Sequence, residues 1–312
     1  MKRGSVVRRA AWIAFALLSA TTDRSARAQE HIALPPVNLG GTSFMDGVGG
    51  PGLLLREGPG VFDAQRFIDA NGATVPGNNS LFAFSSITLA AYMPPFKVLG
   101  GNWGVEVLVP VVNAHVTTPA GSGSATGIGD VTFSPLVWQA PTVSLFGRPF
   151  SERLDLDIVA PTGQYDSSAL ITAGSNLWSV NPYYAFSWLA TDRIETSWRF
   201  HYLWNSANNS PGPGYEATSI QPGQAVHFNG AASFAIVPAL RVGVAGYFLR
   251  QITDSQANGR SVAGSREQVA ALGSGFLIII GVLQLGMNAY GEFAVENRPQ
   301  GTRFTAVAMA AW

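Results

Sequence analysis

The chain has 312 residues, of which 47% are hydrophobic and only 12% are charged, a composition that excludes a disordered protein. Its 19 basic residues balance 19 acidic residues, which leaves no basic excess to bind nucleic acid. The absence of cysteine excludes disulfides, thiolate metal sites and cysteine nucleophiles. The 35 glycines and 18 phenylalanines favour turns and aromatic-rich strands.

Residues 1–28 have the three parts of a secretory signal peptide. A positive region that includes Arg8 and Arg9 precedes an apolar run from Ala10 to Ala20, which is too short to span a bilayer. Ala26-Arg27-Ala28 then matches the A-x-A cleavage pattern. We expect this peptide to be removed on export; the alternative is an amphipathic N-terminal helix of a soluble protein.

Residues 29–49 precede the first expected strand and end in a glycine-rich stretch. Residues 47–52 match the G-x-G-x-x-G pattern of dinucleotide-binding proteins, but no strand precedes them and Pro51 interrupts the pattern. We therefore interpret residues 29–49 as an N-terminal extension. It could fold into a barrel lumen as a plug, or lie loose in the periplasm.

From Phe82 onward, apolar and polar residues alternate in segments of roughly ten residues, which is the pattern of strands with two different faces. Trp198 and Phe200 share one parity, for example, whereas Arg199 and His201 share the other. With a weaker first segment, the expected strands are 51–56, 82–93, 101–112, 127–138, 153–158, 176–189, 193–204, 223–236, 239–252, 266–279, 284–295 and 302–312. Twelve is an even number, as in bacterial outer-membrane barrels.

The connections between these segments alternate in length through most of the chain. Long connections such as 57–81 and 113–126 alternate with short ones such as 94–100, although 139–151 is of medium length. Outer-membrane barrels have such short turns on one side and longer loops on the other.

The uncharged stretch 269–291 could instead form a membrane-spanning helix, but its glycines weaken a helix, and we predict two strands about a tight turn.

The last expected strand ends on Trp312, in register with Phe304 and Ala308 on one face. A terminal aromatic residue that closes an apolar strand is typical of bacterial outer-membrane barrels. The sequence therefore predicts an all-β protein, a twelve-stranded antiparallel transmembrane barrel over residues 50–312, with a narrow lumen. An exported soluble β-sandwich would explain the alternation equally well.

Several sequence blocks occur in a fixed order along the chain: Asn38 to Gly47, Leu99-Gly100-Gly101, Gly129-Asp130, Ala160 to Asp166, Gln251 to Asp254 and Glu296 to Gly301. In their order these blocks resemble the outer-membrane family of transporters of the meta-pathway of phenol degradation. The resemblance implies an outer-membrane β-barrel that moves aromatic or other hydrophobic compounds. It supplies no catalytic or binding residues.

Charged residues on the inward parity of the expected barrel are the candidate lumen-lining residues, because arginine or lysine on the lipid face costs about 2–4 kcal/mol at the midplane. These candidates are Glu106, Asp130, Arg153, Asp155, Asp157, Arg193, Glu195, Arg199, His201 and Glu292. Each of them could contact a solute or merely pair with an opposite charge across strands. Four aromatic residues are expected either to form part of the aromatic girdle at the membrane interface or to pack in the barrel wall: Tyr183, Trp198, Tyr202 and Trp204.

We find no sequence pattern for catalysis or for a cofactor. His201 lies on the parity of Ser197, but no histidine has a hydrolase context, so a lipid hydrolase is a third hypothesis. Asp155 and Asp157 share a face but have no third ligand nearby in the sequence, so no metal is expected.

The sequence thus predicts a non-enzymatic channel of the bacterial outer membrane for passive uptake of small hydrophobic or aromatic compounds. Its expected partners are that solute, outer-membrane lipid and lipopolysaccharide, with no nucleic acid. The oligomeric state stays open.

Overall fold

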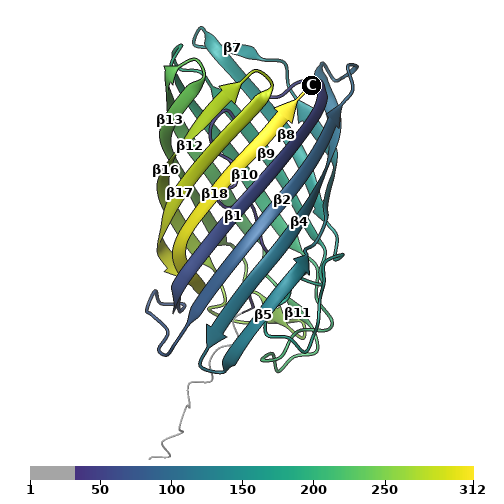
Figure 1. Ribbon diagram of the computed structural model, residues 1–312. Coiled ribbons are helices and arrows are strands. Elements are labelled where there is room, and N and C mark those ends of the chain that lie inside the picture. Colours follow the sequence, from purple (N-terminus) through teal and green to yellow (C-terminus); the bar gives the residue numbers. More distant parts are fainter. Residues whose placement is uncertain (1–31) are drawn as a thin grey trace, which may run out of the picture.

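The computed structural model describes residues 32–312, so the predicted signal peptide and His31 lie outside the described residues. Twelve strands form a closed antiparallel barrel (Figure 1), which confirms the predicted fold. They are β1 (Gly52–Ile68), β2 (Ser80–Met93), β4 (Gly101–Thr118), β6 (Thr132–Gln139), β8 (Arg148–Val159), β9 (Ser179–Trp188), β10 (Ile194–Asn205), β12 (Ala225–Val237), β13 (Leu240–Gln251), β16 (Gln268–Ile280), β17 (Leu283–Glu296) and β18 (Arg298–Ala311). The alternative of an open β-sandwich is wrong, because β1 pairs with both β2 and β18 and so closes the ring.

Six further strands lie outside the ring of twelve. They are β3 (Lys97–Val98), β5 (Gly121–Ile128), β7 (Val143–Leu145), β11 (Ile220–Gln221), β14 (Gln256–Ala257) and β15 (Arg260–Ser261). Strands β5 and β7 pair with β4 and β8, whereas β11, β14 and β15 form a separate small sheet in the loops.

Two predicted loops are wrong in part because they contain strand residues. Strand β1 continues to Ile68, so the first part of the predicted loop 57–81 belongs to the barrel wall, although Gly58-Pro59-Gly60 interrupts the alternation there. The expected loop 113–126 is largely a hairpin of β4 and β5, because Gly- and Ser-rich residues extend the barrel wall there.

The two ends of the barrel differ, as the connection lengths predict. Strand β7 and the C-terminus lie at the short-turn end, and β5 and β11 lie at the opposite, long-loop end (Figure 1). Trp312 exchanges backbone hydrogen bonds with Leu53, so the last residue joins the first strand.

The uncharged stretch 269–291 forms parts of strands β16 and β17, which pair with each other and meet at a turn where Gly281 has a φ of +59°. The prediction of two strands is therefore correct, and the alternative of a helix is wrong. No helix in residues 32–312 is long and apolar enough to span a membrane.

The alternating pattern places opposite chemistries on the two faces of the wall. On β10, Glu195 and Ser197 are buried inside the barrel, whereas Ile194 and Phe200 are exposed outside. Outer aromatic rings contact one another across strands: the Phe200 and Phe228 centroids are 5.7 Å apart, and those of Phe228 and Phe248 are 5.6 Å apart. The wall is therefore apolar on the outside and polar inside.

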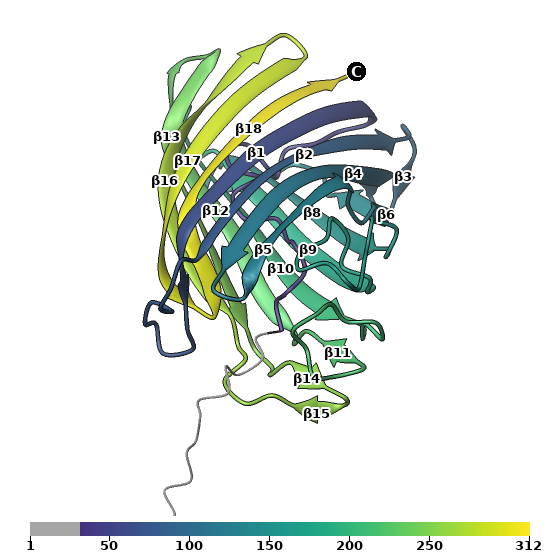
Figure 2. The ribbon, with the colours of Figure 1, turned by 60° about the horizontal axis from the view of Figure 1, so that its bottom comes forward.

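The coil that precedes β1 runs inside the ring of strands (Figure 2). We call residues 32–50 the inner segment. At the long-loop end, the Ile32 carbonyl accepts a hydrogen bond from the Ser255 hydroxyl. Towards the short-turn end, the Gln139 amide donates to the Gly47 carbonyl at 3.0 Å. The inner segment therefore passes through the barrel from the long-loop end towards the short-turn end.

Candidate functional site

Side chains of the wall hold the backbone of the inner segment along its whole length. Because a coil has no strand or helix partner for its N–H and C=O groups, inward polar side chains must satisfy them. The carboxylate of Glu195 accepts the Met45 N–H at 2.8 Å, for instance. Similar hydrogen bonds join Leu34 N–H to Glu267, Gly40 N–H to Asn229, the Gly40 carbonyl to Tyr290 and Thr305, and Gly47 N–H to Ser187.

Apolar side chains of the inner segment form a core with one side of the lumen. Leu34, Leu39 and Phe44 are at most 8% exposed, and they pack against wall residues that include Tyr247 and Tyr290. Burial of one such side chain stabilises the docked segment by about 1.5–3 kcal/mol. The interior thus contains a small hydrophobic core as well as polar groups.

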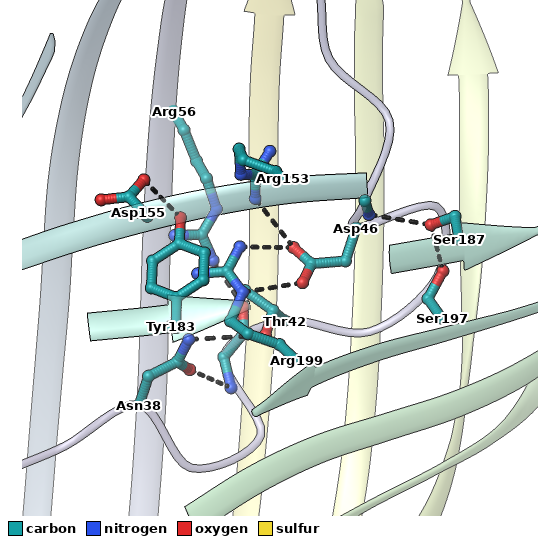
Figure 3. Close-up of polar contacts among 12 residues, drawn as sticks. Asn38, Thr42, Asp46, Arg56, Arg153, Asp155, Tyr183, Ser187, Ser197 and Arg199 are labelled. Atoms are coloured by element: carbon teal, nitrogen blue, oxygen red, sulfur yellow. Dashed lines mark hydrogen bonds and ion pairs between the residues drawn. The ribbon is translucent and has the colours of Figure 1, made fainter. Parts of the chain in front are cut away.

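A group of charged residues that we call the charged centre joins the inner segment to the wall. The Asp46 carboxylate accepts hydrogen bonds from Arg199 Nε at 2.8 Å and Nη2 at 2.6 Å, and Arg153 Nη2 lies 3.8 Å away (Figure 3). The Arg199 guanidinium lies 4.2 Å from the centroid of the Tyr183 ring. Arg56 on β1 donates to the carbonyl of Gly41 at 2.5 Å. Three arginines from separate strands therefore contact the inner segment.

The charged centre predicts how docking of the inner segment responds to pH. Burial alone would raise the pKa of Asp46, but the guanidinium groups of Arg199 and Arg153 outweigh it and hold that pKa below its ordinary value of 3.8. A lowered pKa stabilises the docked state above the ordinary value, and this contribution is lost as the pH falls through the lowered value. We expect the protection from proteolysis that Asp46 contributes, measured as the difference between the wild type and Asp46→Asn, to stay constant from neutral pH to about 4 and to fall below it. A loss of protection between pH 6 and 5 would contradict this assignment.

A second group of acidic residues lies on β4 and β8. Glu106, Asp155 and Asp157 each present a carboxylate oxygen, and these oxygens all lie within 4.8 Å of one another. We call these three residues the carboxylate cluster. The Tyr183 hydroxyl donates to Asp155 at 2.7 Å, and the Ser134 hydroxyl donates to Asp157. The sequence offered no third ligand near Asp155 and Asp157, and the fold supplies one, because Glu106 reaches them from a strand that is distant in sequence.

The structure brings most of the other candidate residues to the interior. Glu292 accepts the Tyr247 hydroxyl at 2.7 Å and the Gly301 N–H at 3.1 Å. His201 is 5% exposed and stacks on His227, with 4.1 Å between the ring centroids. Tyr183 is also interior, only 4% exposed, so it is not part of an interface girdle.

Two candidates lie apart from this interior group. Asp130 lies between β5 and β6, and its carboxylate accepts N–H groups of Gly163 and Ser175 in the following loop. Arg193 is exposed in the turn before β10, with its guanidinium 5.9 Å from the centroid of the Phe234 ring. Parity assigns a residue to a face but gives no position along the barrel, and both residues lie at strand ends.

Sequence reasoning missed Asp46 and Arg56. Asp46 lies in a coil, where no periodic pattern reports the direction of a side chain. Arg56 was placed at the end of a weak strand, although β1 continues for twelve residues beyond it. The one sequence signal for their contact with the lumen is that Asp46 and Arg56, of opposite charge, flank the glycine-rich residues 47–52.

The described residues contain no nucleophile–base pair at Ser197 and His201. The Ser197 hydroxyl bonds to the Ser187 hydroxyl at 2.6 Å, and neither ring nitrogen of His201 has a hydrogen-bond partner within residues 32–312. A serine hydrolase requires a hydrogen bond from the nucleophile to its base. This geometry gives the hydrolase hypothesis no support.

Close contact at Gly47 predicts that a single methyl group displaces the inner segment. A Cβ added at Gly47 would lie 2.4 Å from backbone atoms of Phe186 and Ser187, whereas one added at Gly50 would meet nothing within 4 Å. We expect Gly47→Ala to increase the rate of proteolysis within residues 40–48 and Gly50→Ala to leave it unchanged. Equal rates in the two variants would show that Gly47 does not pack against the wall.

Comparison with known proteins gives one family match and several structural matches. A model of the family described as "Putative MetA-pathway of phenol degradation" matches residues 64–307. The outer membrane channel COG4313 from Pseudomonas putida F1 aligns with a TM-score of 0.74 at 16% identity, over 89% of this chain and 100% of that one. No curated protein sequence matches the chain.

Other solved barrels align more loosely. The β domain of the Bordetella autotransporter BrkA has a TM-score of 0.48 at 11% identity, over 84% of this chain and 100% of that one. The monoaromatic hydrocarbon channel TodX has a TM-score of 0.46 at 8% identity, over 84% and 90%. The likeness to the P. putida channel supports the fold, and the two looser alignments add nothing to that argument.

Proposed function

Because the chain belongs to the MetA-pathway of phenol degradation family, we propose that it is an outer-membrane channel for passive uptake of small hydrophobic or aromatic compounds. The observation that carries this proposal is a closed barrel with an apolar outer face and a lumen lined by polar and charged side chains. Only a wall with hydrocarbon outside and water inside favours that division. The signal peptide is expected to direct export before the barrel inserts.

The inner segment determines how such a channel would conduct. It fills part of the lumen, and a barrel of twelve strands has a narrower lumen than porins of 16–18 strands. Separate hydrogen bonds and the buried ion pair of Asp46 with Arg199 hold the inner segment to the wall, and no continuous strand pairing does so. We infer that residues 32–50 act as a plug and that a solute passes when this segment shifts from the charged centre.

Passive uptake needs no energy source and no chemistry on the solute, so we propose a channel and not an enzyme. Aromatic rings in the lumen suit a hydrophobic solute: Tyr247 and Tyr290 have centroids 5.3 Å apart beside the inner segment. Their hydroxyls bond to Glu292 and to Gly40, and both rings are at most 3% exposed beneath the inner segment, so a shift of that segment would open their faces to an apolar solute.

The test is the initial rate at which Gram-negative cells take up labelled phenol at micromolar concentration. Cells that make the wild-type protein should exceed empty-vector cells, and the variant Arg193→Ala, changed outside the lumen, should behave as the wild type. Heat-modifiable migration on a gel checks that each variant forms a barrel. If a folded wild-type protein gives the empty-vector rate, the proposed uptake function is wrong.

A further inference from the structure

We propose that the carboxylate cluster of Glu106, Asp155 and Asp157 binds a calcium ion inside the barrel wall. This inference goes beyond the proposed uptake function and does not depend on it. It rests on the positions of oxygen atoms contributed by β4, β8 and β9, and on the partners that those atoms lack.

The spacing of the three carboxylates suits a calcium ion. One oxygen from each residue lies within 4.8 Å of the other two. Calcium–oxygen distances are about 2.3–2.6 Å, so ligands on opposite sides of the ion are about 4.6–5.2 Å apart and neighbouring ligands are closer. A single ion among the three oxygens can therefore contact all of them, with small adjustments of the side chains.

Unpartnered acceptors at and beside the cluster are a second observation, which points to a missing donor or cation. Asn181 is 7% exposed and its Oδ1 has no hydrogen-bond partner in residues 32–312. It lies directly opposite Asp157 in the pairing of β8 and β9. Opposite residues carry their side chains on one face, with Cβ atoms about 4.5–5.5 Å apart, so the Asn181 amide borders the cluster.

Asp155 also has a buried oxygen without a hydrogen-bond partner. It is 3% exposed, and although Oδ2 accepts the Tyr183 hydroxyl, Oδ1 has no partner in the described part of the chain. A buried acceptor without a donor costs free energy comparable to a lost hydrogen bond, and more if it is charged. A cation that several oxygens share would remove this cost for Asn181 and Asp155 together.

The three arginines of the charged centre contact the inner segment, although Arg153 Nε has no hydrogen-bond partner in residues 32–312. Arg199 and Arg153 make their ion pairs with Asp46, and Arg56 donates to the Gly41 carbonyl. Across residues 32–312, no lysine, arginine or histidine nitrogen lies within 4.0 Å of a cluster carboxylate oxygen. Because all candidate ligands are oxygens, the site favours a hard cation over zinc or copper.

The wall around the cluster is irregular, which gives the ion a structural role. The pairing of β4 with β6 shifts register between Gly104 and Glu106, and that of β6 with β8 shifts between Phe133 and Val137. An ion bound by β4, β8 and β9 would join strands across this irregular part of the ladder. Calcium is therefore expected to raise the thermal unfolding temperature of the barrel.

Terbium luminescence tests the site, because Tb³⁺ substitutes for Ca²⁺ and is sensitised by a nearby tyrosine. The Tyr183 hydroxyl already contacts Asp155. Chelator-treated full-length protein in detergent should bind one Tb³⁺ per chain with excitation at the aromatic band, and Ca²⁺ should displace it. Calcium affinity is then measured by calorimetry on the same protein.

The double variant Asp155→Asn/Asp157→Asn should weaken Ca²⁺ affinity at least tenfold and abolish the calcium-dependent rise in unfolding temperature. Asp192→Asn is the matched control, because Asp192 has a side chain 94% exposed in the turn before β10. Heat-modifiable migration confirms that the double variant folds; if it does not, Glu106→Gln replaces it with the same expected loss. Absence of saturable binding to the wild type, or equal affinity in the cluster variants, would overturn the proposal whether or not the protein transports phenol.

Discussion

Deletion of residues 33–49 is expected to raise single-channel conductance several-fold. These residues occupy the lumen, where Leu34, Leu39 and Phe44 pack against the wall and Asp46 pairs with Arg199. No strand is lost, since β1 begins at Gly52. Ions would then cross a water-filled barrel interior rather than the space left beside a folded coil. Conductance of the purified protein in planar lipid bilayers measures this change.

The control for the deletion is a variant that keeps the inner segment and changes a loop instead. Gly259→Ala strains only the turn between β14 and β15, where Gly259 has a φ of +73° and an added Cβ meets no atom within 4 Å. It should conduct as the wild type does. If the deletion variant migrates as a folded barrel but conducts no better than the wild type, the inner segment does not restrict the lumen.

Asp46→Asn is expected to release the middle of the inner segment. The substitution leaves Arg199 and Arg153 buried without their counterion, and breaking a buried ion pair costs about 3–5 kcal/mol. That change corresponds to about a hundredfold to a few thousandfold in a local opening equilibrium. Amide hydrogen exchange of residues 40–48, measured in micelles, should accelerate by this factor.

A matched Asp→Asn change separates this effect from a general loss of stability. Asp69 accepts the N–H groups of Asn71 and Ala73 in the exposed loop after β1. Asp69→Asn should accelerate exchange in that loop alone. Exchange of residues 40–48 that stays at the wild-type rate in Asp46→Asn would show that apolar packing, and not the ion pair, holds the segment.

The strands could be predicted from the sequence because two solvents act on alternate residues. Ile194 and Phe200 face outward while Glu195 and Ser197 face inward, and this division repeats around the barrel. The prediction was wrong where glycine and proline interrupt the pattern. Gly58-Pro59-Gly60 belongs to β1, since the pairing with β2 continues through all three residues, whereas the pairing with β18 skips Gly58 and Pro59.

The sites were harder to predict because they depend on registers between strands. Glu106 meets Asp155 only through the pairing of β4 and β8 with β6, and both of those pairings contain register shifts. Asp46 reaches Arg199 across 153 residues from a segment without period. Alternation predicts the face of a residue, but neither its height in the barrel nor its partner.

Passage through the lumen beside a movable inner segment is tested most directly by a reversible cross-link. The natural chain has no cysteine, and Asn288 Nδ2 donates to Ser43 Oγ at 3.2 Å, so Ser43→Cys/Asn288→Cys introduces one pair that can join the segment to β17. Each single-cysteine variant serves as a control. We predict that phenol uptake by cells with the double variant is low when the disulfide is closed and returns to the wild-type rate after reduction. The same uptake rate in the oxidised and reduced states would show that the solute does not take this route.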